Sequence, residues 1–193
     1  MTELWLVRHG QTDWNLANIV QGHSDIPLND TGLTQARELA EKLSGTHFDA
    51  LYCSDLLRAR QTADILAESL NLEVVIEPRI REIRQGVWEG YSIPEILLMF
   101  PEEFRRKNEN PLVPAAEGAE SVAEVVRRMV GVANELRERH AGQRLLLVTH
   151  GFAIAALTCV ARQIPIQEVA QYIPDNGTPV VINMPEALLM PEF

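Results

Sequence analysis

Hydrophobic and polar positions follow two different periods along this chain, and each change of period marks an expected element. Short apolar runs that stop abruptly at glycine or polar residues are typical of buried strands; one ends at Val7, and others fill residues 49–53, 73–76, 144–149 and 178–183. Longer segments with apolar residues at spacings of three and four are typical of helices; they are 32–43, 55–70, 121–139 and 151–160, with a shorter one at 102–107. We expect Thr31 to cap the first of these helices.

Segments of the two kinds alternate, which favours an α/β layer architecture. We predict a three-layer αβα sandwich with a mostly parallel central sheet, in which residues 178–183 form an antiparallel edge strand. No repeat or long linker divides the sequence, so residues 1–193 are expected to form a single domain. Residues 84–117 contain four prolines and are the least regular part, which is typical of a lid or specificity insertion beside a site.

Composition and charge limit the classes of partner. With 17 basic and 27 acidic side chains, the formal net charge is −10, so most of the surface would repel nucleic acid and no nucleic acid partner is expected. No apolar run approaches the ~20 residues of a membrane helix, and Met1-Thr2-Glu3 leads directly into a strand, so we expect a cytoplasmic protein without a membrane partner. Cys53 and Cys159 are expected to be reduced core thiols. No residue cluster has metal-ligand spacing, and no metal is expected.

Two of the predicted strands end in the same way, and these ends carry the candidate chemistry. Arg8-His9-Gly10 follows the first strand, and His150-Gly151 follows the strand at 144–149. Ligands of open α/β sheets bind just beyond the carboxyl ends of the strands. A histidine there is a candidate nucleophile, and a neighbouring arginine is a planar fork suited to phosphate oxygens. Each histidine alone could simply end a strand; two of them beside Arg8 favour one shared pocket.

These residues resemble the signature of the histidine phosphatase superfamily, also called the phosphoglycerate mutase-like family. The resemblance covers the chain from Leu4 to about Phe152 in four blocks that occur in the family's order. The blocks are 6–15, 54–63, 81–90 and 149–151. It implies a phosphatase domain that uses neither a metal nor another cofactor, and a small phosphorylated substrate.

The resemblance also implies roles for individual residues. His9 would attack phosphorus and form a phosphohistidine, which requires a neutral ring whose other nitrogen donates to an acceptor. Glu82 would protonate the leaving oxygen, with Glu89 as the weaker alternative. The donors expected to surround the phosphoryl group are Arg8, Arg58 and His150, the last most useful when protonated. The expected phosphate- or substrate-binding residues are Asn15, Gln21, Gly22, Thr12 and Gly151.

Some of these assignments have competing explanations. Ordinary loop hydrogen bonding explains Thr12 equally well. Arg60 lies about 200° around the predicted helix from Arg58, so we expect it at the surface. His23 departs from the family pattern and is expected to be a surface side chain, with a position at the rim of the pocket as the alternative.

The central residues serve phosphatases and mutases alike. In the cofactor-dependent phosphoglycerate mutases a Tyr and a Lys follow the acid, and the corresponding positions here are Gln85 and Ile93. We therefore predict a metal-independent phosphomonoesterase, with the mutase as the alternative. Arg105-Arg106-Lys107 is expected to be a solvated helix face, although it could bind a second anion and so favour the mutase. A catalytically inactive binding protein is a third alternative, but all five central residues are present.

The last apolar segments leave the oligomeric state open. Val180-Val181-Ile182 and Leu188-Leu189-Met190 are apolar enough for contacts between two copies of the chain, which would give a homodimer. Burial within one chain explains them as well.

Overall fold

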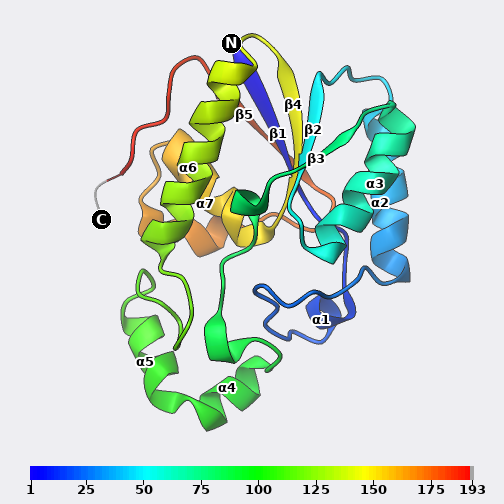
Figure 1. Cartoon of the computed structure of the whole chain (residues 1–193). Helices are drawn as coiled ribbons and strands as arrows, with labels where there is room; N and C mark the ends of the chain where they lie inside the picture. The colour runs from blue at the N-terminus through cyan, green and yellow to red at the C-terminus, as the bar shows by residue number, and fades with distance from the viewer. Residues whose placement is uncertain (192–193) are drawn as a thin grey trace.

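The computed structural model describes residues 1–191, and its centre is a five-stranded sheet (Figure 1). The strand order is β3-β2-β4-β1-β5. Four strands are parallel, namely β1 (Thr2–Arg8), β2 (Ala50–Cys53), β3 (Val74–Ile76) and β4 (Arg144–Thr149). The fifth, β5 (Pro179–Met184), runs antiparallel to β1 at the edge. The predicted sheet and its antiparallel edge strand are confirmed.

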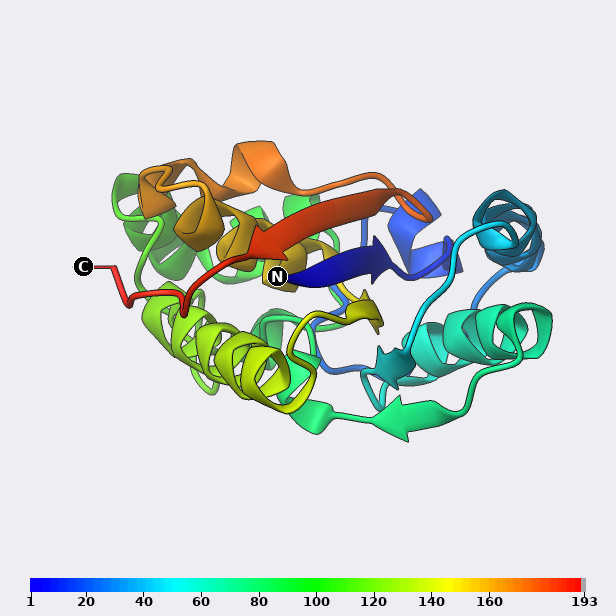
Figure 2. The ribbon, with the colours of Figure 1, turned by 90° about the horizontal axis from the view of Figure 1, so that it is seen from above.

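Helices cover both faces of the sheet, as Figure 2 shows from above. One face carries α2 (Asp30–Leu43) and α3 (Leu57–Leu70), and the other carries α6 (Val122–Arg139) and α7 (Gly151–Ala161). A separate cluster of buried apolar side chains joins each pair of helices to the strands. Because β1 and β4 are the central strands, their side chains contribute to both clusters, and the three-layer αβα prediction is confirmed.

The segment between β1 and α2, residues 9–29, is the first loop of the chain. The two helices nearest to it begin differently from the prediction. Asn29, not Thr31, caps α2: its backbone is extended and its Oδ1 accepts from the amide of Gly32 at 2.9 Å. Thr31 already lies inside the helix. Helix α3 begins at Leu57 without a local cap, and Asp25 of the first loop accepts from the amide of Leu57 at 2.6 Å instead. A remote carboxylate therefore ties the first loop to α3.

The segment predicted to be irregular contains two helices, α4 (Ile93–Met99) and α5 (Pro101–Glu109). The sequence pattern did not predict α4 and predicted α5 only over residues 102–107. Pro94 and Pro101 lie in the first turns of these helices, where a missing amide hydrogen costs nothing. A small apolar cluster around Trp88 and Ile96 holds the insertion together beyond the carboxyl ends of the strands (Figure 1).

Four shorter helices complete the described chain. They are α1 (Asp13–Leu16), η1 (Pro78–Ile80), η2 (Gly86–Trp88) and η3 (Ile166–Tyr172). Cys53 and Cys159 are buried free thiols, and burial raises the pKa of each. Among residues 1–191, no helix combines the length and apolar character that crossing a bilayer requires.

The last apolar segments are partly used within the chain. Ile182 is buried in the cluster on the α6–α7 face, and Leu188 packs against the same cluster. Leu189 is exposed. The homodimer stays a prediction.

Candidate active site

The carboxyl ends of the central strands bring the two predicted histidines together. Arg8 pairs with Thr149 in the register of β1 and β4, and the amide of His9 donates to the Thr149 carbonyl at 3.1 Å. His9 and His150 follow directly, and their ring centroids lie 5.1 Å apart. Ser54 follows β2 at the same edge. The strand ends therefore form one site, as expected from the parallel topology.

His9 is held as a neutral imidazole with one nitrogen directed at the site. Its Nδ1 lies 2.7 Å from the Gly10 carbonyl, which can only accept, so Nδ1 carries the hydrogen. The lone pair is thereby left on Nε2. Burial, together with the nearby Arg58 and Arg8 guanidinium groups, lowers the pKa of His9 well below its ordinary value. His9 is therefore already neutral before substrate binds, as a nucleophile must be.

Gly10 is needed for a close backbone approach. A Cβ at this position would lie 2.4 Å from the carbonyl oxygen of Gly32 in the first turn of α2. The loop after β1 and the start of α2 thus touch backbone to backbone.

Arg58 connects the nucleophile to the first loop. The side chain is 1% exposed; its Nε donates to Nε2 of His9 at 3.2 Å, and its two terminal nitrogens donate to the carbonyls of Ser24 and Gly22, each at 2.8 Å. Burial lowers the pKa of Arg58 to about 10, so the group remains charged at neutral pH. Arg60, two residues further along α3, is exposed as predicted.

Arg8 and His150 have polar atoms that await a partner. Arg8 donates from one terminal nitrogen to the Pro174 carbonyl at 2.8 Å, whereas its buried Nε has no partner among the described residues. Nε2 of His150 lies 2.8 Å from the Ser54 hydroxyl, and the buried Nδ1 likewise has no partner within residues 1–191. Buried polar groups are nearly always hydrogen-bonded, so these atoms mark the place for a polar ligand.

The surroundings of His150 favour its neutral form in the ligand-free structure. Burial, reinforced by the positive charge of Arg58, lowers the pKa of His150 well below its ordinary value. The ring is neutral at physiological pH without a ligand. Without a ligand, His150 therefore presents a neutral N–H at the site.

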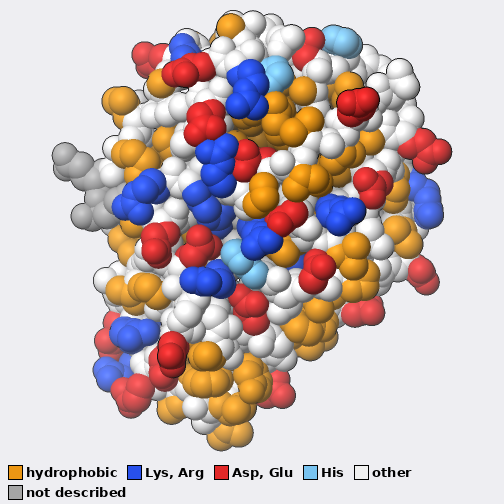
Figure 3. Space-filling view, viewed as in Figure 1, with side chains coloured by type: hydrophobic (Ala, Val, Ile, Leu, Met, Phe, Trp, Pro, Cys, Tyr) orange, Lys and Arg blue, Asp and Glu red, His pale blue; other side chains and the backbone are white. Residues whose placement is uncertain are grey.

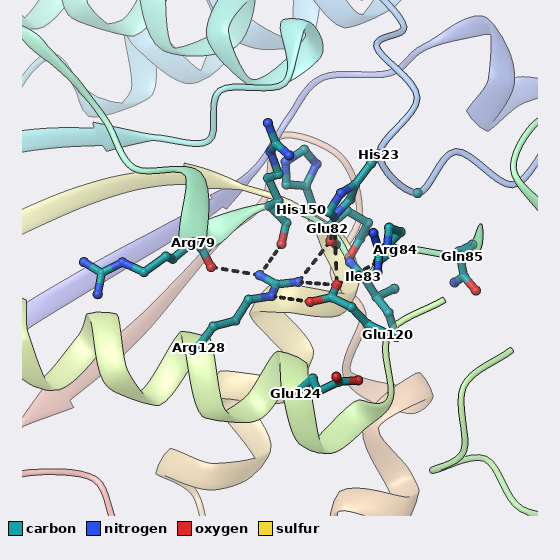
Figure 4. Close-up of polar contacts among 12 residues, drawn as sticks. His23, Arg79, Glu82, Ile83, Arg84, Gln85, Glu120, Glu124, Arg128 and His150 are labelled. Atoms are coloured by element: carbon teal, nitrogen blue, oxygen red, sulfur yellow. Dashed lines mark hydrogen bonds and ion pairs between the residues drawn. The ribbon is translucent and has the colours of Figure 1, made fainter. Parts of the chain in front are cut away.

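Glu82 follows η1 and lies near His150 (Figure 4). Two backbone amides orient its carboxyl. Oε1 accepts from the amide of Ile83 at 2.9 Å, and Oε2 accepts from the amide of Phe152 at the start of α7 at 3.2 Å. When ionised, this carboxylate counteracts the effect of burial on the pKa values of Arg8 and Arg58. The structure thus brings Glu82 to the same edge as the histidines.

Glu89, the alternative acid, is occupied elsewhere. Its Oε1 accepts from the amides of His23 and Gln85, each at 3.0 Å, and its Oε2 accepts from the Ser24 hydroxyl at 3.3 Å. These contacts join the first loop to the start of the insertion. Glu89 therefore acts as a brace between two loops.

The predicted binding residues of the first loop differ in whether their polar atoms already have hydrogen-bond partners. Thr12 and Asn15 form the capping box of α1, each side chain accepting from the other's amide at 3.1 Å, so local structure accounts for Thr12. Gly22 has a φ of +49° and gives its carbonyl to Arg58. Gln21 presents a buried Oε1 that has no partner among residues 1–191.

Gly151 begins α7, and the lack of a side chain there leaves room for Arg8. A Cβ at this position would lie 3.2 Å from Nε of Arg8 and 2.8 Å from Cγ2 of Ile173. Gly151 thus permits the arginine to lie across the start of the helix.

His23 lies at the rim of the site, the alternative to the surface position that the sequence favoured. It is half-buried rather than a surface side chain, and its Nε2 lies 2.8 Å from the Glu82 carbonyl. Since a carbonyl only accepts, Nε2 donates. No periodicity or spacing signals this contact, because it joins residues 59 positions apart.

Figure 3 shows basic side chains and a histidine gathered in the middle of one face, with carboxylates among them. The chain has a formal net charge of −10, so this gathering of basic side chains is a local departure from the overall charge. Within residues 1–191, no group of three or more His, Cys, Asp or Glu side chains is arranged to hold a metal ion.

Known proteins share this sequence and architecture. The model of the histidine phosphatase superfamily (branch 1) matches residues 4–187. Phosphoserine phosphatase 1 of Hydrogenobacter thermophilus is 38% identical over 96% of this chain and 88% of its own length. The probable phosphoglycerate mutase GpmB of Yersinia pestis is 37% identical over 86% of this chain and 77% of its own length. The mycobacterial glucosyl-3-phosphoglycerate phosphatase solved with VO3 is 30% identical, covers 93% of this chain and 90% of its own, and has a TM-score of 0.84. This chain therefore belongs to the histidine phosphatase superfamily, branch 1.

Proposed function

We propose that this protein is a metal-independent phosphomonoesterase that hydrolyses a small phosphorylated metabolite through a phosphohistidine at His9. The observation that carries the proposal is the convergence of a neutral His9 with unpaired donors and a carboxyl group. The Nε2 lone pair of His9 accepts from Nε of Arg58, and a phosphoryl oxygen would take over that donor and free the lone pair. The family and its phosphatase members support it, since two of the similar proteins are named as phosphatases of small phosphorylated metabolites.

The first half-reaction forms a P–N bond and breaks a P–O bond. Nε2 of His9 attacks phosphorus while Glu82 gives its proton to the departing alkoxide. Arg8, Arg58 and His150 donate to the three phosphoryl oxygens, where negative charge concentrates. The unpaired Nε of Arg8 and Nδ1 of His150 are the atoms suited to this. With Ser54 donating to Nε2 of His150, the hydrogen of that ring lies on Nδ1.

The second half-reaction returns the site to its resting state. Ionised Glu82 takes a proton from a water molecule, whose oxygen attacks the phosphohistidine. The P–N bond breaks, and inorganic phosphate leaves. His9 recovers its lone pair and Glu82 its proton, so no other reagent is consumed.

The basic run of α5 does not favour the mutase alternative. Arg105 pairs with Glu102 at 2.7 Å and with Glu109 at 3.1 Å, while Lys107 donates to the carbonyls of Pro111 and Val113. These cations already have partners within α5 and the loop that follows. A second substrate anion would have to displace them.

Phosphate release from a panel of monoesters in excess chelator tests the proposal. The panel contains p-nitrophenyl phosphate, phosphoserine, α-ribazole phosphate, sugar phosphates and 3-phosphoglycerate, and an isomerisation assay of 3-phosphoglycerate runs beside it. We expect chelator-resistant release that is strongest on one compound. Isomerisation that depends on 2,3-bisphosphoglycerate, with little release, would establish the mutase instead. Inactivity in both assays would favour a binding protein.

The buried histidines predict a loss of stability in mild acid. In the unfolded chain His9 and His150 titrate near 6.5, whereas in the folded protein the pKa of each is well below that value. Below about pH 6.5 the unfolded state therefore binds protons that the folded state does not. Each histidine then lowers the free energy of unfolding by up to ~1.4 kcal/mol per pH unit, until the folded pKa is reached.

Thermal unfolding between pH 7.5 and pH 5 in a phosphate-free buffer measures this effect. The melting temperature should fall as the pH drops through 6.5, and His9→Asn should show a shallower fall because one buried imidazole is gone. Identical slopes for the two proteins would contradict the assignment of His9 as a buried neutral ring.

A further inference from the structure

Arg128 of α6 lies beneath the segment that carries Glu82. Its side chain is 16% exposed, and its guanidinium donates to three carbonyls of that segment (Figure 4). The acceptors and distances are Arg79 at 2.8 Å, Arg81 at 2.6 Å and Glu82 at 3.0 Å. One side chain thus holds the backbone on the approach to Glu82 and at Glu82 itself.

Glu120, which lies between the insertion and α6, binds both Arg128 and the backbone after Glu82. Its carboxylate accepts from Nε and Nη2 of Arg128 at 3.0 and 3.1 Å, and also from the amide of Arg84 at 2.8 Å. The amide of Glu120 donates to the Arg84 carbonyl at 2.9 Å. The backbone on both sides of Glu82 is therefore tied to the Arg128–Glu120 pair.

The hydrogen-bonding capacity of Arg128 is fully used in this place. A guanidinium has five N–H donors, and the five contacts to the carbonyls and to Glu120 account for all of them. Lysine could not reproduce this planar fork with its single ammonium group. On the opposite side, His23 donates to the same Glu82 carbonyl at 2.8 Å. The backbone of residue 82 is thus held between the first loop and α6.

We propose that Arg128, held in place by Glu120, is a positioning residue that keeps the carboxyl of Glu82 within hydrogen-bond distance of the leaving oxygen. The inference rests on the proposed role of Glu82 as the proton donor. Proton transfer requires hydrogen-bond distance between donor and acceptor, and a displacement of about 1 Å caused by a distant substitution can cost ~10²-fold in rate. Arg128 itself touches no reacting atom.

If Arg128 served only to stabilise the fold, its replacement would change the turnover of different substrates in a different way. Loosening the fold lowers the amount of active protein, so it reduces turnover of every substrate by the same factor. Loss of a positioned acid slows substrates with poor leaving groups and spares those whose leaving group departs without a proton. Aryl and alkyl phosphates therefore distinguish the two.

The experiment compares kcat/KM on p-nitrophenyl phosphate with kcat/KM on the alkyl phosphate that the panel shows to be turned over fastest, because kcat/KM excludes the hydrolysis of the phosphohistidine, which is common to all substrates. The variants are Arg128→Met, Arg128→Lys, Glu82→Gln and the double variant Glu82→Gln/Arg128→Met. Arg127→Met is the matched control, because Arg127 is the neighbouring arginine of the same helix but is exposed. Circular dichroism and melting temperatures accompany each protein, and Arg128→Lys serves as the test if Arg128→Met does not fold.

We expect Arg128→Met to lose about 10²-fold in kcat/KM on the alkyl phosphate and far less on the aryl phosphate, with Arg128→Lys intermediate and Arg127→Met unchanged. In the Glu82→Gln background, the change at Arg128 should cost little more, since both act at one step. Equal losses on the two substrates, or losses that multiply in the double variant, would overturn the inference while leaving Glu82 as the acid. A Glu82→Gln enzyme slowed equally on both substrates would instead overturn the role of Glu82, and this inference with it.

Discussion

Replacing His9 with alanine is expected to reduce turnover by at least about 10⁴-fold while the protein still folds. Without Nε2 no covalent bond to phosphorus can form, and water would have to attack the ester directly. The donors of Arg8 and His150 remain, so some binding of the phosphate should survive. Arg58 loses a hydrogen-bond acceptor but keeps its two carbonyl partners, Ser24 and Gly22.

Rapid-quench mass spectrometry provides the measurement. The wild-type protein should accumulate an acid-labile phosphoryl group on the peptide that contains His9, and the variant should show none. His47→Ala is the control, because His47 is an exposed histidine whose side chain is 83% accessible. Turnover by His9→Ala within tenfold of the wild type, with normal folding, would exclude His9 as the nucleophile.

Replacing Glu82 with glutamine is expected to lower kcat/KM for alkyl phosphates by about 10²–10⁴-fold and for p-nitrophenyl phosphate much less, because kcat/KM reports the step in which the leaving group departs. The amide has nearly the same shape as the carboxyl but cannot give a proton to the alkoxide. A p-nitrophenolate leaves as a stable anion and does not need that proton. The effect should therefore grow with the basicity of the leaving group.

Glu89→Gln is the matched comparison for this prediction. Glu89 braces the first loop through the amides of His23 and Gln85, so its loss should loosen the site for every substrate alike. The slope of log(kcat/KM) against leaving-group pKa should thus steepen for Glu82→Gln and stay unchanged for Glu89→Gln. The reverse pattern would assign the acid role to Glu89.

The architecture of the site was predictable because its residues occupy the ends of strands. Arg8, His9 and His150 follow apolar runs that must be buried, and parallel strands bring their carboxyl ends to one edge. The insertion was less predictable. Helices α4 and α5 depend on a small cluster around Trp88 and Ile96 that assembles only in three dimensions.

The long-range hydrogen bonds that hold the site in place could not be predicted from the pattern of hydrophobic and polar residues. Asp25 accepts from the amide of Leu57, and Arg128 donates to the carbonyl of Glu82, across 32 and 46 positions of the chain. A polar residue on a helix or loop appears solvated until its partner is known. For the same reason, the sequence favours a surface position for His23 over the rim of the site, because its partner, the Glu82 carbonyl, is 59 positions away.

The sequence by itself determined the alternation of strands and helices, the parallel sheet, and the identity of the groups that gather at its edge, because hydrophobic periodicity and short motifs are local properties. The tertiary structure alone decided which nitrogen of His9 keeps its lone pair, that His150 rests neutral, and how Glu82 is held. These properties depend on burial and on partners far away in the chain, which shift proton equilibria and fix hydrogen bonds only after the backbone has folded.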